Sequence, residues 1–151
     1  MRGIVPHILV IEARFYEHLS CMLLKGCTSV LNSRGISWNS VITPGVLEIP
    51  AAVSMAIEAF KNKDNNIYNG IVVLGVVMRG ETSHCDIIAQ EATRGLMDIA
   101  IKHSFPIGNG IVVVDNEKQA LDRASAYKLD RGGFAANSVL KMIELKASLS
   151  K

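Results

Sequence analysis

Apolar and polar residues follow two different spacings along this chain. Short, nearly unbroken apolar runs bounded by Gly, Pro or charged residues predict strands, and a mixed segment closed by the turn Pro44-Gly45 predicts one more. Longer segments with an apolar residue at every third or fourth position predict helices. The expected strands are residues 8–13, 38–42, 70–77 and 111–114. The expected helices are residues 19–33, 49–60, 84–99, 117–125 and 132–148.

Strands and helices therefore alternate through most of the chain. Such an order, with strands apolar on both faces, predicts an α/β fold in which a four-stranded parallel sheet lies between two layers of helices. A length of 151 residues suits one domain, which we expect to span residues 1–151. Four strands are few for so apolar a chain. We therefore expect other copies of the chain to cover part of the helix surface.

Composition narrows the function classes. The net charge is only +2 and Lys and Arg form no run, so nucleic-acid binding is not expected. No apolar stretch reaches the length of a membrane span or of a signal peptide. The three cysteines, Cys21, Cys27 and Cys85, have neither the even number of a disulfide framework nor a zinc-binding spacing. A reducing cytoplasm is the expected compartment, and no metal site is expected.

The densest chemistry lies where the apolar run 70–77 passes into the helix that begins near His84. Thr82 or Ser83 is a natural N-cap for that helix. In parallel α/β sheets such junctions lie at the ligand-binding edge, and the free N–H groups of a helix N-terminus attract a phosphate or carboxylate. The same positive end favours a neutral imidazole that can act as a base. His84 is therefore the best catalytic candidate.

Plainer interpretations of the same residues remain open at this level. A histidine on a helix more often only makes a hydrogen bond, and Arg79 and Glu81 could form a local ion pair. Glu48, close to the start of another helix, can simply complement the helix dipole. What favours a site is that three strand ends carry their residues, Phe15 and Glu48 among them, to one edge of the sheet.

Four segments in order resemble the 6,7-dimethyl-8-ribityllumazine synthase family, which acts in the penultimate step of riboflavin synthesis. Each motif is weak alone, but their order and separation also match. The segments are Ala13–Phe15, Pro44–Pro50, Leu74–Asp86 and Arg123. The resemblance covers nearly the whole chain, from about Ile8 to Leu145.

The resemblance implies a flavodoxin-like αβα sandwich that assembles as a pentamer, or a multiple of it, with active sites shared between neighbouring subunits. It implies condensation of 5-amino-6-(D-ribitylamino)uracil with 3,4-dihydroxy-2-butanone 4-phosphate, releasing phosphate and water. Family members use no metal or organic cofactor. Small molecules and other copies of the chain are then the expected partners.

The resemblance also assigns roles to individual residues. Phe15 would stack on the pyrimidine ring, and Asn109 would reach the site from the adjoining subunit. The residues assigned to ribitylaminouracil are Phe15, Val46, Leu47, Glu48, Val76, Val77, Met78 and Asn109. The residues assigned to the butanone phosphate are Glu81 and Thr82, through backbone N–H groups, and Arg123, through its guanidinium. His84 would move protons, and Arg131 is a further possible contact.

The chain departs from the family pattern at several positions. Tyr16 follows Phe15 where Asn is usual, and Asn109 stands where an aromatic residue is frequent. Arg131 replaces a common Lys, and Phe134 replaces a frequent acidic residue. Arg131 keeps the positive charge but changes its geometry. Phe134 removes any ion pair expected there.

Three alternative functions deserve comparison. A flavin-binding electron carrier shares the topology but needs a Ser-, Thr- or Gly-rich phosphate loop after the first strand, where this chain has Ala13–Glu17. A non-catalytic homologue would keep the fold without turnover, although the presence of His84 and Arg123 argues against it. The similarly folded archaeal type of riboflavin synthase is less well matched by the segment from Arg79 to His84.

Overall fold

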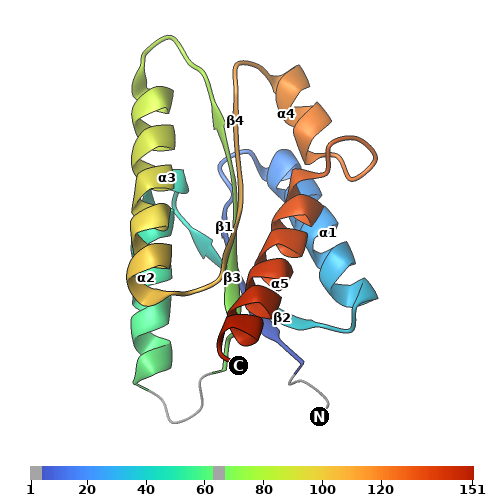
Figure 1. Ribbon diagram of the computed structural model, residues 1–151. Helices are drawn as coiled ribbons and strands as arrows, with labels where there is room; N and C mark the ends of the chain where they lie inside the picture. Colours follow the sequence, from blue (N-terminus) through green and yellow to red (C-terminus); the bar gives the residue numbers. More distant parts are fainter. Residues whose placement is uncertain (1–4, 63–66) are drawn as a thin grey trace.

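The fold is described here from a computed structural model, which describes residues 5–62 and 67–151 (Figure 1). Strands and helices alternate as the sequence predicts. The strands are β1 (His7–Ala13), β2 (Ser37–Thr43), β3 (Gly70–Met78) and β4 (Ile107–Val114). The helices are α1 (Glu17–Ser33), the short 3₁₀ helix η1 (Val46–Glu48), α2 (Ile49–Lys61), α3 (His84–His103), α4 (Glu117–Ala124) and α5 (Arg131–Leu149).

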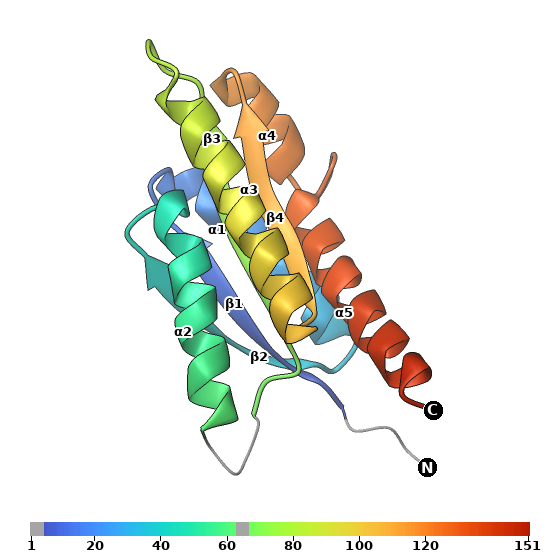
Figure 2. The same ribbon diagram turned by 60° about the vertical axis from the view of Figure 1, so that its left-hand side comes forward.

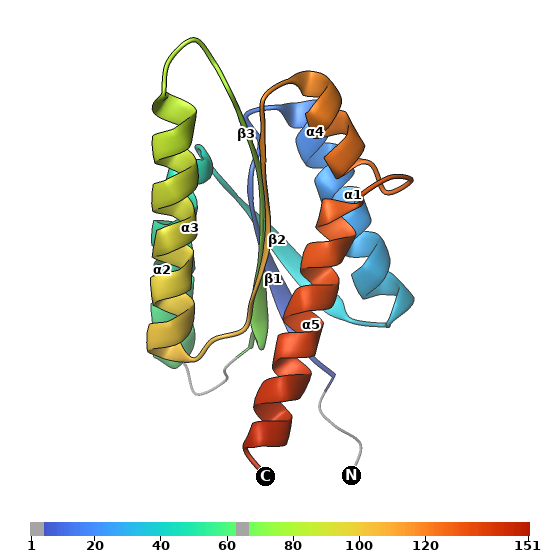
Figure 3. The same cartoon turned by 45° about the horizontal axis from the view of Figure 1, so that its top comes forward.

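The four described strands form one parallel sheet in the order β2-β1-β3-β4. Helices α1, α4 and α5 cover one face, and α2 and α3 cover the other (Figures 1 and 3). Figure 2 shows α2 and α3 lying side by side over their face of the sheet. The predicted three-layer α/β fold is confirmed.

Residues of β1 show why the sheet needs both layers. Ile8 and Val10 pack into the core under α1 and α5, while Leu9 and Ile11 pack into the core under α2 and α3. Successive side chains of a strand point to opposite faces, so an unbroken apolar run serves two cores at once. The edge strand β2 is different because Val41 and Ile42 remain exposed in a single chain.

Strand β4 begins four residues earlier than predicted, at Ile107 instead of Ile111. The sequence predicts that Pro106–Gly110 only introduces the strand. Glycine in a strand often marks a place where another backbone approaches closely. Here the missing side chain is required: a Cβ on Gly108 would lie 2.2 Å from the carbonyl oxygen of Ala135 in α5. Pairing with β3 begins at Ile107, and glycine at position 108 leaves room for α5 to pack against this part of the strand.

The predicted element ends agree well elsewhere. Gly35 takes a left-handed conformation with φ of 66° just beyond α1, and the Asn116 side chain caps α4 by accepting a 2.9 Å hydrogen bond from the Gln119 N–H. In the described residues, no helix combines the length and hydropathy that a membrane-crossing segment needs.

Candidate active site

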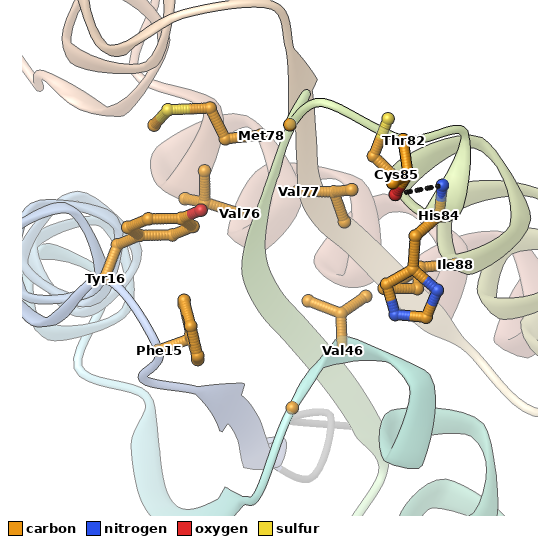
Figure 4. A pocket seen from close by; sticks show the side chains of 12 residues that line it. Phe15, Tyr16, Val46, Val76, Val77, Met78, Thr82, His84, Cys85 and Ile88 are labelled. Carbon is orange, nitrogen blue, oxygen red and sulfur yellow. Dashed lines mark hydrogen bonds between the residues drawn. The ribbon is translucent and has the colours of Figure 1, made fainter.

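A cavity of about 330 Å³ opens at the carboxyl ends of β1 and β3 (Figure 4). This volume falls in the range of ordinary small-molecule sites. Its walls come from the turn after β1, from η1, from the end of β3 and from the first turns of α3. The lining residues are Phe15, Tyr16, Gly45, Val46, Val76, Val77, Met78, Gly80, Thr82, His84, Cys85 and Ile88.

Two aromatic rings form one side of the cavity. Phe15 is 77% exposed, and its ring meets that of Tyr16 edge to face at 5.0 Å between centroids. The turn that carries them is held by Ser20, whose hydroxyl donates to the carbonyls of Ala13 and Tyr16. An aromatic face left uncovered beside a cavity suits a flat heterocyclic ligand.

The end of β3 passes through the middle of the cavity. Val76 belongs to the core under α1 and α5, whereas Val77 belongs to the core under α2 and α3. Val46 of η1 reaches β3 because residue 75 is glycine: a Cβ there would lie 2.7 Å from Val46 Cγ2. Gly75 thus allows η1 to form the cavity wall against the strand.

The opposite side is the N-terminus of α3. Ser83 occupies the N-cap as predicted, but its hydroxyl makes no capping hydrogen bond. The Thr82 hydroxyl accepts a long hydrogen bond of 3.4 Å from the backbone N–H of His84 (Figure 4). The Asp86 N–H donates to the Ser83 carbonyl at 3.1 Å, so the Cys85 N–H is the first-turn donor that is left available to a ligand. The exposed His84 ring stands at this end, across the cavity from Phe15 (Figure 4).

Arg79 holds the turn before α3 in place. Its Nε donates to Asp115 at 2.9 Å, its Nη2 donates to Asp86 at 3.3 Å, and its backbone N–H donates to the Val114 carbonyl at 2.9 Å. The hydrogen bond to Asp115 and the charge of Asp86 raise the pKa of Arg79. The local ion pair with Glu81, one interpretation of the sequence, is replaced by these two aspartates.

The remaining predicted residues do not line this cavity. Leu47 and Glu48 are exposed on η1 beside Val46, and the Glu48 carboxylate lies against Gly45. Glu81 is exposed in the turn before α3. Asn109 is exposed on β4, where its side chain accepts a hydrogen bond from the Ile111 N–H.

Arg123 and Arg131 lie together elsewhere. They line a separate hollow of about 360 Å³ beside β4, with Ile111, Val113 and Leu129. Arg123 donates to the Gln119 carbonyl of its own helix at 3.3 Å. In a single chain, His84 and the two arginines therefore lie in separate hollows, and Leu47, Glu48, Glu81 and Asn109 line neither of them.

Comparison with known proteins fits this geometry. The sequence pattern of the 6,7-dimethyl-8-ribityllumazine synthase family matches residues 6–147. A protein of that name from Agrobacterium fabrum is 48% identical over 144 residues, which is 95% of this chain and 97% of the relative. The chain belongs to the 6,7-dimethyl-8-ribityllumazine synthase family. The synthase 1 of Rhizobium meliloti is 47% identical over 95% of this chain and 93% of its own length. The synthase of Bartonella bacilliformis is 48% identical over 93% of this chain and 90% of its own length.

Two departures from the expected family pattern contact each other. The Arg131 guanidinium lies over the Phe134 ring, 4.3 Å from its centroid. A cation–π contact of this kind holds a guanidinium in place without a carboxylate. The aromatic ring thus supplies a partner where an ion pair would otherwise be expected in this family.

Five lining residues were not predicted as site residues: Tyr16, Gly45, Gly80, Cys85 and Ile88. Tyr16 was noticed only as a departure from the lumazine synthase pattern. Cys85 and Ile88 lie one and four positions beyond His84, so helical spacing alone could have indicated that Ile88 shares its face. In the described residues, no three His, Cys, Asp or Glu side chains gather closely enough to hold a metal ion.

Proposed function

We propose that this chain condenses 5-amino-6-(D-ribitylamino)uracil with 3,4-dihydroxy-2-butanone 4-phosphate to give 6,7-dimethyl-8-ribityllumazine, phosphate and water. The observation that carries the proposal is the cavity itself, in which an uncovered aromatic ring faces a histidine at a helix N-terminus. Membership in the lumazine synthase family supports the same reaction. Residues 1–151 then act as one domain, in the cytoplasm.

The uracil substrate fits the apolar side of the cavity. The Phe15 face stacks on the pyrimidine ring, and Val76, Val77 and Met78 contact its edge. The ribityl chain runs along η1, where Val46, Leu47 and Glu48 lie, and the exposed Glu48 carboxylate accepts hydrogen bonds from its hydroxyls.

The phosphate of the second substrate fits the N-terminus of α3. Backbone N–H groups of Glu81 and Thr82 donate to its oxygens, and the helix dipole favours its charge. This placement sets the carbon chain of the butanone between the uracil ring and His84. His84 then removes or delivers protons at the carbon that lies between the ketone carbon and the carbon that bears the phosphate.

A neighbouring subunit completes the site in this proposal. Arg123, Arg131 and Asn109 all belong to the β4 side of the chain and line no part of the cavity with His84. The same side exposes apolar residues, with Val113 50% and Leu129 59% exposed, which favours burial against another copy. In a pentamer, each subunit would present its β4 side to the cavity of the next, and Arg123 would bind the phosphate.

The reaction depends mainly on orientation. The substrate amine attacks the ketone and forms an imine with loss of one water. A proton is then removed from the neighbouring carbon, phosphate leaves, and the resulting enol becomes a carbonyl. The ribitylamine nitrogen attacks this carbonyl and closes the ring with loss of a second water. Holding two reactive molecules together can lower the barrier by about 7–11 kcal/mol. Proton transfer by His84 adds a smaller factor, on the order of 10²–10⁴.

The test mixes purified protein with both substrates and follows lumazine absorbance against the uncatalysed reaction. We expect wild type to accelerate the reaction and Arg123→Ala to raise KM for the butanone phosphate. No acceleration by folded, oligomeric wild type at any pH would favour the non-catalytic homologue instead.

Mixed oligomers test whether sites are shared. His84→Ala and Arg123→Ala subunits are unfolded together at equal amounts, refolded and assayed. If the two residues come from different subunits, about a quarter of the sites regain both, and activity rises above that of either variant. Unchanged low activity in the mixed oligomers would place both residues in one subunit and contradict the proposal.

A further inference from the structure

A second cavity, of about 480 Å³, lies at the opposite edge of the sheet from the active site. It is formed where α2, α3 and α5 end and where β3 and β4 begin, near the lower end of the molecule in Figure 1. Strand β3 separates the two cavities by its length, about 26 Å at a rise of ~3.3 Å per residue. The proposed synthase reaction makes no use of this cavity.

Two lysine ammonium groups, from α2 and α5, and a histidine at the end of α3 line this cavity. The Lys61 ammonium at the end of α2 lies 2.8 Å from Nδ1 of His103, the last residue of α3. The Lys146 ammonium of α5 donates to the Ser104 carbonyl at 2.8 Å. Each ammonium has further N–H donors beyond these contacts. No Asp or Glu is found among the described residues that line the cavity.

Aromatic rings form the adjoining wall. The Phe60 ring lies between Tyr68, at 4.9 Å between centroids, and Phe105, at 6.2 Å. All three rings are partly exposed and line the cavity. The rings are tilted by 40° and 37° to one another, and an aromatic wall of this kind next to two ammonium groups is complementary to a flat ring that carries an anion.

We propose that this cavity is a second small-molecule site, which binds an aromatic phosphate. The ring packs against Phe60, Tyr68 and Phe105, and the phosphate accepts hydrogen bonds from Lys61 and Lys146. A phosphate is favoured over a carboxylate because two ammonium groups on different elements can each bind a separate oxygen of a doubly charged anion.

Isoleucine methyl groups distinguish the two cavities. Ile57 and Ile143 line the new site, whereas Ile88 lines the active site. The assembled protein, with labelled isoleucine methyl groups, is titrated with phenyl phosphate, phenylacetate and inorganic phosphate and followed by NMR. We expect phenyl phosphate to shift Ile57 and Ile143 saturably, with an affinity about tenfold or more above that of the other two probes.

Matched variants locate the binding groups. Lys61→Ala with Lys146→Ala should weaken phenyl phosphate binding at Ile57 and Ile143 about tenfold or more, while lumazine formation stays unchanged. Lys25→Ala with Lys141→Ala removes the same charge from exposed positions outside the cavity and should leave binding intact.

Several results would overturn the proposal. Shifts confined to Ile88 would mean that the probe enters only the active site. Equal affinity for inorganic phosphate would exclude a role for the rings, and equal affinity for phenylacetate would exclude the paired ammonium groups. Loss of binding in the Lys25 and Lys141 control would show that net charge alone is responsible. Because lumazine formation is measured separately, failure here leaves the synthase reaction untouched.

Discussion

The buried thiol of Cys27 should make the stability of this protein fall at alkaline pH. Cys27 lies on α1 with no exposed surface, packed in the core under α5. Burial raises the pKa of this thiol from 9.0 to about 12, and the nearby carboxylates of Asp130 and Glu12 act in the same direction. The folded chain therefore keeps the proton over a range of pH in which the unfolded chain loses it.

The direction and the size of the change in stability follow from this difference in pKa between the folded and the unfolded chain. Below pH 9 both states hold the proton, so the contribution to stability is complete; between pH 9 and about 12 only the unfolded state loses it, and stability decreases. At pH 10 the unfolded thiol is mostly ionised. The free energy of unfolding should then be about 1.4 kcal/mol lower than at pH 8 because of this one group.

Urea unfolding of wild type and Cys27→Ala at pH 8 and pH 10 isolates the effect. The smaller side chain lowers stability at both pH values, but it removes the titrating group. Other titrating residues, including Cys21 and Cys85, are present in both proteins and cancel. Protein concentration must be equal throughout, because assembly also contributes to stability. If the free energy of unfolding falls by the same amount in wild type and in Cys27→Ala between pH 8 and pH 10, the reasoning is refuted.

Three further substitutions test the active site. His84→Ala should lower kcat by about 10²–10⁴ yet stay above the uncatalysed rate, and a fully inactive but assembled variant would contradict the dominance of orientation. Gly75→Ala places a Cβ against Val46, so urea unfolding should show a loss of about 1–3 kcal/mol and KM for ribitylaminouracil should rise; Gly80→Ala, whose Cβ meets nothing within 4 Å, is the stability control. Arg79→Ala removes the hydrogen bonds to Asp115 and Asp86 that fix the turn before α3, so KM for the butanone phosphate should rise several-fold with little change in melting temperature. An unchanged KM would show that the turn keeps its conformation without Arg79.

Much of the fold could be predicted because its signals are local. An unbroken apolar run such as 70–77 can bury both faces only inside a sheet, and Gly35 and Asn116 fix element ends through backbone conformation and capping. The gathering of Phe15, Val46 and His84 at one edge also followed from sequence, because the carboxyl ends of parallel strands share an edge.

Tertiary packing decided the rest. Strand β4 starts at Ile107 because it pairs with β3 from that residue on, and Gly108 leaves room for Ala135 of α5, 27 positions later in the chain. No local pattern records either contact. Arg79 binds Asp115 because β3 and β4 are neighbours in the sheet. His84 and Arg123 both belong to the family resemblance, but they lie in separate hollows of a single chain. The reason is that Arg123 is on α4, which follows the edge strand β4. The sequence by itself determined which helices and strands form, through short-range periodicity and capping. It also determined at which edge of the sheet the candidate residues gather. Which side chains meet depended on strand order and helix approach, since these arise only when distant segments pack.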